Sequence, residues 1–154
     1  MPRTDVTFLD HWLLVACVLF GIQSLLWILI GSFDPLGVWD GLLAGAFYDG
    51  QTPESVERFR RFILGPLGAT SAACFLALAF IVRFPFRRRE PWAFTAVASA
   101  VWLWFLVDTA ASIYHGALFN VWLVNVPCVV ALSIPLAGLY RRFRGPAKSR
   151  RQNA

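Results

Sequence analysis

Four apolar runs, each about as long as a membrane-spanning helix, divide this chain of 154 residues. They cover residues 12–31, 62–82, 92–114 and 119–140. An α-helix needs about 20 apolar residues to cross the roughly 30 Å of hydrocarbon in a bilayer. Charged residues make up only 15% of the chain, which is too little to cover the surface of a soluble domain. We therefore predict an all-α, polytopic membrane protein, with a four-transmembrane-helix bundle as a single domain over residues 1–154.

The first apolar run is expected to stay in the membrane rather than to be cleaved as a signal peptide. Its start carries Asp5 and Asp10 beside Arg3, and its end offers no clear small-x-small cleavage site. The cysteines stand singly along the chain, at Cys17, Cys74 and Cys128. This spacing indicates neither a disulfide framework nor a thiolate metal site.

The distribution of basic residues predicts the orientation of the bundle. The segment between the second and third runs carries Arg83, Arg87, Arg88 and Arg89. Residues 141–154 form a basic tail without any acidic residue. By the positive-inside rule both segments face the cytoplasm, so the two termini are expected to be cytoplasmic and residues 32–61 to lie outside. Short loops and many Ala, Arg, Gly and Leu residues favour a bacterial inner membrane.

The net charge of +5 does not indicate nucleic-acid binding. The basic tail has a single aromatic residue among its charges, Phe143, and no folded module around it. Basic residues next to membrane spans attract anionic lipid headgroups instead. Membrane lipids are therefore the expected partners, and nucleic acid is not.

A short helix is predicted in the outer segment between the first two runs. Its apolar residues recur at helical spacing and are Trp39, Leu42, Leu43, Ala46 and Phe47. Such a helix can lie on the membrane surface as an interfacial anchor, or it can form a lid over the outer mouth of the bundle. The following helix is expected to begin near Pro53, with Thr52 capping its first amides. Pairs four residues apart are expected along it, Glu54 with Arg58 and Glu57 with Arg61.

The second run carries small residues spaced four apart, Gly65, Ala69, Ala73 and Ala77. This small-xxx-small pattern lets two membrane helices approach closely, so it predicts a packing seam. Prolines interrupt two runs, at Pro66 in the second and at Pro127 and Pro135 in the fourth. Bends with freed backbone carbonyls are expected there.

Asp108 is the most unusual residue of the apolar runs. A carboxylate within a membrane span costs roughly 2.5–3.5 kcal/mol on insertion scales, so its neighbours must satisfy it or its chemistry must need it. At a rise of 1.5 Å per residue, Asp108 lies about 9 Å below the outer end of its helix. The other runs offer polar side chains at a comparable depth, Gln23, Thr70, Ser71 and Asn125. These depths predict an outward-facing polar site in the outer half of the bundle.

Asp108, Ser112 and His115 share one helix face by their spacing. If the site performs chemistry, Asp108 and His115 are the expected catalytic acid and base. The expected ligand-binding residues are Gln23, Thr70, Ser71, Ser112, Asn120 and Asn125. The alternative is structural: Asp108 pairs with Arg61 or accepts hydrogen bonds from its polar neighbours, and His115 is an ordinary exposed histidine at the aqueous boundary.

Two functions from different classes remain open. The first is a non-enzymatic bundle that binds a lipophilic small molecule, or that packs against a larger membrane complex or a second copy of itself. The second is a membrane enzyme that uses Asp108 for isomerase or cyclase chemistry on a sterol-, quinone- or isoprenoid-like substrate. No cofactor or metal is expected, because the two histidines, His11 and His115, lie at opposite ends of the membrane and cannot clasp one haem.

Overall fold

The computed structural model describes residues 6–30, 34 and 36–143. Its elements are α1 (Phe8–Ile30), α2 (Val38–Phe47), α3 (Glu54–Ile81), the π-helical segment η1 (Val82–Phe86), α4 (Pro91–Tyr114), the single-turn α5 (Leu118–Asn120), the π-helical segment η2 (Val121–Asn125) and α6 (Val126–Phe143). Four helical stretches are long and apolar enough to cross a membrane, Phe8–Leu29, Glu54–Phe86, Pro91–Tyr114 and Leu118–Phe143. The predicted fold, four spans with a short helix between the first two, is confirmed. The chain is a multi-pass membrane protein.

The helix of the second span begins close to its predicted start near Pro53, well before the apolar run that it contains. The helix α3 starts at Glu54, and Pro53 stands at the N-cap without a side-chain cap hydrogen bond. The backbone carbonyl of Pro53 accepts the first helical bond, from Glu57 N at 3.0 Å. The prediction that Thr52 caps this helix is therefore wrong, because the rigid proline already sets the helix entry. The expected side-chain pairs are present, with 3.4 Å from Arg58 to Glu54 and 3.2 Å from Arg61 to Glu57.

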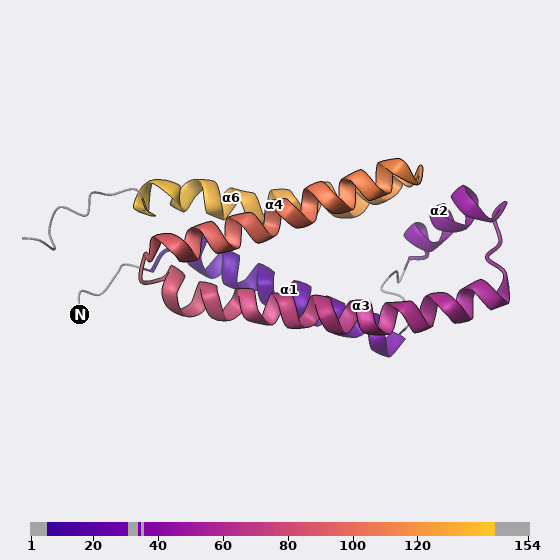
Figure 1. The fold of residues 1–154 in the computed structure, drawn as a ribbon, viewed down its shortest axis with the longest axis horizontal. Coiled ribbons are helices and arrows are strands. Elements are labelled where there is room, and N and C mark those ends of the chain that lie inside the picture. The colour runs from indigo at the N-terminus through magenta and orange to yellow at the C-terminus, as the bar shows by residue number, and fades with distance from the viewer. Residues whose placement is uncertain (1–5, 31–33, 35, 144–154) are drawn as a thin grey trace, which may run out of the picture.

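The helices pack mainly as two pairs. The helix α1 lies along α3, and α4 lies along α6, while α1 also contacts α6. Figure 1 shows the two pairs close together where α1 begins, α3 turns into α4 and α6 ends, and further apart toward α2. We call the first region the Arg89 end, after Arg89 in the α3–α4 turn, and the other the α2 end.

The apolar core of the bundle is concentrated at the Arg89 end. Its buried residues come from the start of α1, η1, the first half of α4 and most of α6, and they include Leu13, Cys17, Val82, Phe86, Val97, Leu136 and Leu139. Aromatic rings close this end, with ring centroids 4.7 Å apart for Phe86 and Phe143 and 5.1 Å apart for Phe94 and Phe143. The apolar packing of the bundle is therefore densest at the Arg89 end.

The contact between α1 and α3 depends on a glycine outside the predicted seam. A Cβ added to Gly68 would lie 2.5 Å from the backbone oxygen of Ser24 and 3.1 Å from Ile28 Cγ1, so only glycine fits. The predicted seam at Gly65, Ala69, Ala73 and Ala77 is wrong within this chain. Its alanines are exposed, and a Cβ on Gly65 would meet nothing within 4 Å. Which face of α3 packs against α1 depends also on the larger side chains of α1. The spacing of small residues on α3 alone does not determine that face.

Two of the prolines stand at or beside a change of helix type. Pro85 lies within η1, and Pro127 is the second residue of α6, just after η2, whereas Pro66 and Pro135 lie inside α3 and α6. A proline within a helix has no N–H to donate and crowds the carbonyl four residues before it. A single π turn relieves that crowding by shifting the hydrogen-bond register. The turn η2 thereby sets where Asn125 points within the fourth span.

Candidate functional site

A hydrogen-bonded cluster at the α2 end gathers around Asn120. Asn120 is the last residue of α5, and its Nδ2 lies 3.0 Å from Ser112 Oγ and 3.2 Å from Asp108 Oδ2. A longer contact of 3.5 Å joins the same nitrogen to Asn125 Oδ1. An amide nitrogen has two protons to donate, so these acceptors share them and the longest contact is the weakest. Asn120 therefore links α4 to the fourth span.

The other end of the Asn120 amide faces α2. Its Oδ1 accepts a hydrogen bond of 3.1 Å from Trp39 Nε1, and the Trp39 ring packs edge-on against Phe119 with centroids 5.9 Å apart. A second tether holds α2 to α3, because Asp40 forms an ion pair with Arg60. The helix α2 thus covers the Asn120 side of the bundle, an arrangement that agrees with the lid interpretation. Sequence reasoning missed Trp39, which it treated only as part of an apolar helix face.

Asn125 completes the cluster from the fourth span. Its side chain is fully buried, with 0% of its surface exposed, and its Nδ2 donates to Thr109 Oγ1 at 3.1 Å. Ser112 is also buried, with 7% of its surface exposed. Burial of these polar groups does not leave them unsatisfied, because each of them has a hydrogen-bond partner. The cluster joins Asp108, Thr109, Ser112, Asn120 and Asn125 with Trp39.

Asp108 has unused hydrogen-bonding capacity. Its side chain is half-buried, and among the described residues its carboxylate accepts one hydrogen bond, from Asn120. An ionised carboxylate can accept about four hydrogen bonds. The expected alternative partner Arg61 bonds to Glu57 instead, at 3.2 Å. Within the part of the chain that the structure describes, no cation lies within ion-pair distance of Asp108.

The remaining predicted site residues stand apart from this cluster. His115 is exposed just beyond α4, and its ring packs edge-on against Tyr114 at a centroid distance of 5.0 Å. The hydroxyl of Thr70 is exposed and donates to Pro66 O at 2.9 Å. Gln23 and Ser71 are half-buried, and no hydrogen bond joins either of them to the cluster in the described chain. Of the predicted site residues, the structure thus brings together Asp108, Ser112, Asn120 and Asn125. It leaves His115 and the residues of α1 and α3 apart from them.

A second polar centre lies at the Arg89 end. Arg89 donates two hydrogen bonds to the carboxylate of Asp10, at 2.6 and 2.8 Å, and the Asp10 side chain is fully buried. The backbone N–H and the hydroxyl of Thr7 also donate to Asp10, at 2.8 and 2.7 Å. The guanidinium lies 5.6 Å from the centre of the Phe143 ring. This centre ties the start of α1, the α3–α4 turn and the end of α6 together.

The sequence contained a signal for this ion pair. Asp10 and Arg89 stand just before the first and third apolar runs. Arg89 was interpreted as a marker of topology, and Asp10 as evidence against a cleaved signal peptide. The charges lie 79 positions apart in the chain, so only the packing of α1 against the α3–α4 turn reveals their pairing. The saturation of the Asp10 carboxylate by Arg89 and Thr7 makes this centre structural.

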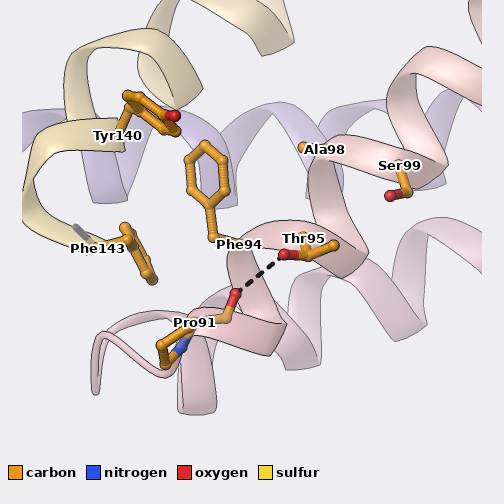
Figure 2. A pocket seen from close by; sticks show the side chains of 7 residues that line it. All are labelled: Pro91, Phe94, Thr95, Ala98, Ser99, Tyr140 and Phe143. Carbon is orange, nitrogen blue, oxygen red and sulfur yellow. Dashed lines mark hydrogen bonds between the residues drawn. The ribbon is translucent and has the colours of Figure 1, made fainter.

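Two grooves on the surface lie away from the Asn120 cluster. One, of about 340 Å³, lies between α4 and α6 and is lined by Pro91, Phe94, Thr95, Ala98, Ser99, Tyr140 and Phe143. Figure 2 shows the Phe94 ring between Tyr140 and Phe143, with the Thr95 hydroxyl bonded to Pro91 O at 3.3 Å. Another, of about 430 Å³, lies where α3 and η1 meet the start of α4. Both belong to the Arg89 end.

No metal-binding constellation is formed by the residues that the structure describes, since no three His, Cys, Asp or Glu side chains gather at one point. The cysteines of the spans are free thiols. The chemistry on offer at the Asn120 cluster is therefore hydrogen bonding and the charge of one carboxylate.

Comparisons with known proteins do not add a functional assignment. No family model matches the chain, and neither curated proteins nor solved structures give a significant match. The geometry of the four-span bundle and its polar cluster is therefore the basis for a functional proposal.

Proposed function

We propose that the protein binds a lipophilic small molecule through the Asn120 cluster at the α2 end. The observation that carries this proposal is the Asp108 carboxylate, half-buried within a membrane span and bonded only to Asn120 Nδ2 among the described residues. An ionisable residue at such a position is costly and usually marks a ligand or ion pathway. A hydroxyl or amino group on the ligand would supply the donor that Asp108 lacks.

The surroundings of Asp108 support a ligand with one polar end and an apolar body. The α4 side chains one turn before Asp108, on its own face of the helix, are aromatic: Trp104, with 37% of its surface accessible, and the half-buried Phe105. An apolar body can lie along them in the hydrocarbon, while its polar end reaches Asp108 and Asn120. The helix α2, held by Trp39 and Asp40, covers the cluster on the other side.

The experiment that tests this function is mass spectrometry of small molecules retained by the purified protein. Asp108→Asn keeps the shape but removes the charge, and hydrogen bonds to charged groups contribute about 1.5–3 kcal/mol. We expect the variant to retain the molecule at least tenfold less than the wild type does. Asp49→Asn, the same change in the exposed turn after α2, is the matched control and should retain it fully.

Two results would overturn the proposal. One is equal retention of a defined lipophile by Asp108→Asn and Asp49→Asn. The other is the recovery of bulk phospholipid alone from the wild type, which would favour a structural role for Asp108 and a protein partner for the bundle.

An enzymatic role has less support from the geometry. Acid/base catalysis by Asp108 and His115 needs both groups near one reacting atom. His115 is exposed and shares no hydrogen bond with the cluster in the described chain. A turnover assay on the identified lipophile, with Asp108→Asn as the inactive variant, would be required to revive this alternative.

We also propose the orientation of the bundle in a bacterial inner membrane, with the α2 end outside and both termini in the cytoplasm. Its support is the arginine-rich α3–α4 turn and the basic residues that follow Tyr140. The site would then receive its ligand from the outer side of the membrane.

A further inference from the structure

The groove where α3 and η1 meet α4 combines opposite charges with an apolar wall. It measures about 430 Å³ and is lined by Phe80, Ile81, Phe84, Pro85, Arg88, Glu90 and Trp92. The turn beneath it is well defined, because Arg88 N and Glu90 N both bond to the Pro85 carbonyl, at 3.1 and 3.2 Å. The ion pair of Arg89 with Asp10 holds the same turn from the inner side. The backbone around the groove is therefore held in place, and the groove itself is shallow and open.

The two charged residues of the groove do not neutralise each other. Arg88 is exposed, and its guanidinium makes no ion pair or hydrogen bond among the described residues. Glu90 is half-buried, and one of its oxygens accepts a hydrogen bond of 2.7 Å from Trp92 Nε1. The groove thus offers a cation and a carboxylate to an occupant that carries the complementary pair.

The apolar wall is formed by aromatic side chains of α3, η1 and α4. Phe80 and Phe84 are stacked, with ring centroids 6.0 Å apart, and 56% and 47% of their surfaces are exposed. Trp92, with 55% of its surface exposed, stands on the facing helix α4. Exposed aromatic rings at the end of a membrane span typically mark the headgroup level of the bilayer.

We propose that this groove is a binding site for a phospholipid with a primary ammonium headgroup. The lipid phosphate would bond to Arg88, its ammonium would donate to Glu90, and an acyl chain would lie over Phe80 and Phe84. Arginine suits phosphate because its planar fork donates parallel hydrogen bonds. A glycerol headgroup has no cation for Glu90, and a trimethylated ammonium has no N–H to donate to it. The pairing of Arg88 with Glu90 therefore favours phosphatidylethanolamine over both.

The test is native mass spectrometry of delipidated protein titrated with phosphatidylethanolamine, phosphatidylglycerol and phosphatidylcholine of identical acyl chains. The wild type should bind the first at least fivefold more than either of the others. Glu90→Gln should abolish this preference while phospholipid still binds, and Arg88→Gln should weaken binding of all three lipids at least fivefold. Arg141→Gln, which removes an exposed arginine outside the groove, is the matched control and should change neither quantity.

The outcomes that overturn the inference are distinct. Equal binding of the three lipids to the wild type would reduce the groove to ordinary lipid contact. A preference for phosphatidylglycerol that Glu90→Gln leaves unchanged would indicate a plain basic patch. Because Arg88 is exposed and Glu90 only half-buried, the variants should fold, and their thermal unfolding in detergent verifies this independently of lipid binding.

Discussion

At the scale of single residues, Arg89 shows how a charge can serve the fold of a membrane protein. Its backbone is left-handed, with φ of 58°, which costs a non-glycine residue roughly 1–2 kcal/mol. Its guanidinium gains two hydrogen bonds to Asp10, whose side chain is fully buried. Removing one member of a buried ion pair leaves the other uncompensated, whereas removing both does not.

We therefore predict that Asp10→Asn and Arg89→Gln each lower the free energy of unfolding by about 3–5 kcal/mol. The double change Asp10→Leu with Arg89→Met should recover part of that loss, because it leaves no buried charge behind. Denaturant unfolding in detergent measures both effects, with Arg142→Gln as the exposed control. Unfolding of either single variant at the wild-type midpoint would show that the pair does not stabilise the bundle.

The candidate site was partly predictable at this scale. The spacing of Asp108 and Ser112 on one helix indicated a shared face, and both acceptors do bond to Asn120. The role of Trp39 was not predictable, because its contact with Asn120 spans 81 positions and depends on how α2 packs. Local periodicity places residues on a face of their own helix but does not say what that face meets.

At the scale of elements, α3 illustrates the limits of apolar runs. Its membrane-spanning stretch Glu54–Phe86 contains 33 residues, about 50 Å of helix, which exceeds the thickness of the hydrocarbon. The charged turns from Glu54 to Arg61 are helical because ion pairs along the helix and the ties to α2 support them. Hydropathy locates only the part of α3 within the membrane. It does not detect the charged helical turns from Glu54 to Arg61 that precede this part.

Two glycines of α3 differ in the space around them, because Gly68 lies against α1 and Gly65 does not. Gly68→Ala should lower the free energy of unfolding by about 1–3 kcal/mol, because the new methyl group would clash with the Ser24 carbonyl and drive the helices apart. Gly65→Ala, one turn away and open around its Cβ position, should be neutral or stabilising. Thermal unfolding of the two variants in the same detergent measures the difference. An equal effect of both substitutions would mean that α1 does not approach α3 at Gly68.

At the scale of the whole molecule, the two ends of the bundle differ in the interactions that they contain. Apolar packing and the Asp10–Arg89 pair hold the Arg89 end, and the polar cluster occupies the α2 end. The four spans and the short helix were predictable from hydropathy and from helical spacing. A segment in lipid must be apolar and must satisfy its own backbone hydrogen bonds, so each span leaves a clear pattern in the sequence. The pairing of α1 with α3 and of α4 with α6 was not predictable. Lipid is as apolar as the side chains, so close packing and not hydrophobicity determines which helices are neighbours.

The proposed orientation makes a prediction for the whole chain. In a variant with the native cysteines replaced by alanine, Gln51→Cys should react with a membrane-impermeant maleimide in intact bacterial cells. Arg141→Cys should react only after the cells are permeabilised, because arginines are retained on the cytoplasmic side. Both positions are exposed, so their reactivity reports the side of the membrane. The reverse pattern of labelling would invert the bundle and place the Asn120 cluster on the cytoplasmic side.

If the cluster around Asn120 binds a lipophile, the retention of small molecules by Asn120→Leu should reveal it. This change removes the amide that joins Asp108, Ser112 and Trp39. We predict that the variant folds as a four-helix protein and retains the molecule at least tenfold less than wild type, while Gln51→Leu in the exposed loop retains it fully. Undiminished retention by a folded Asn120→Leu variant would contradict the account.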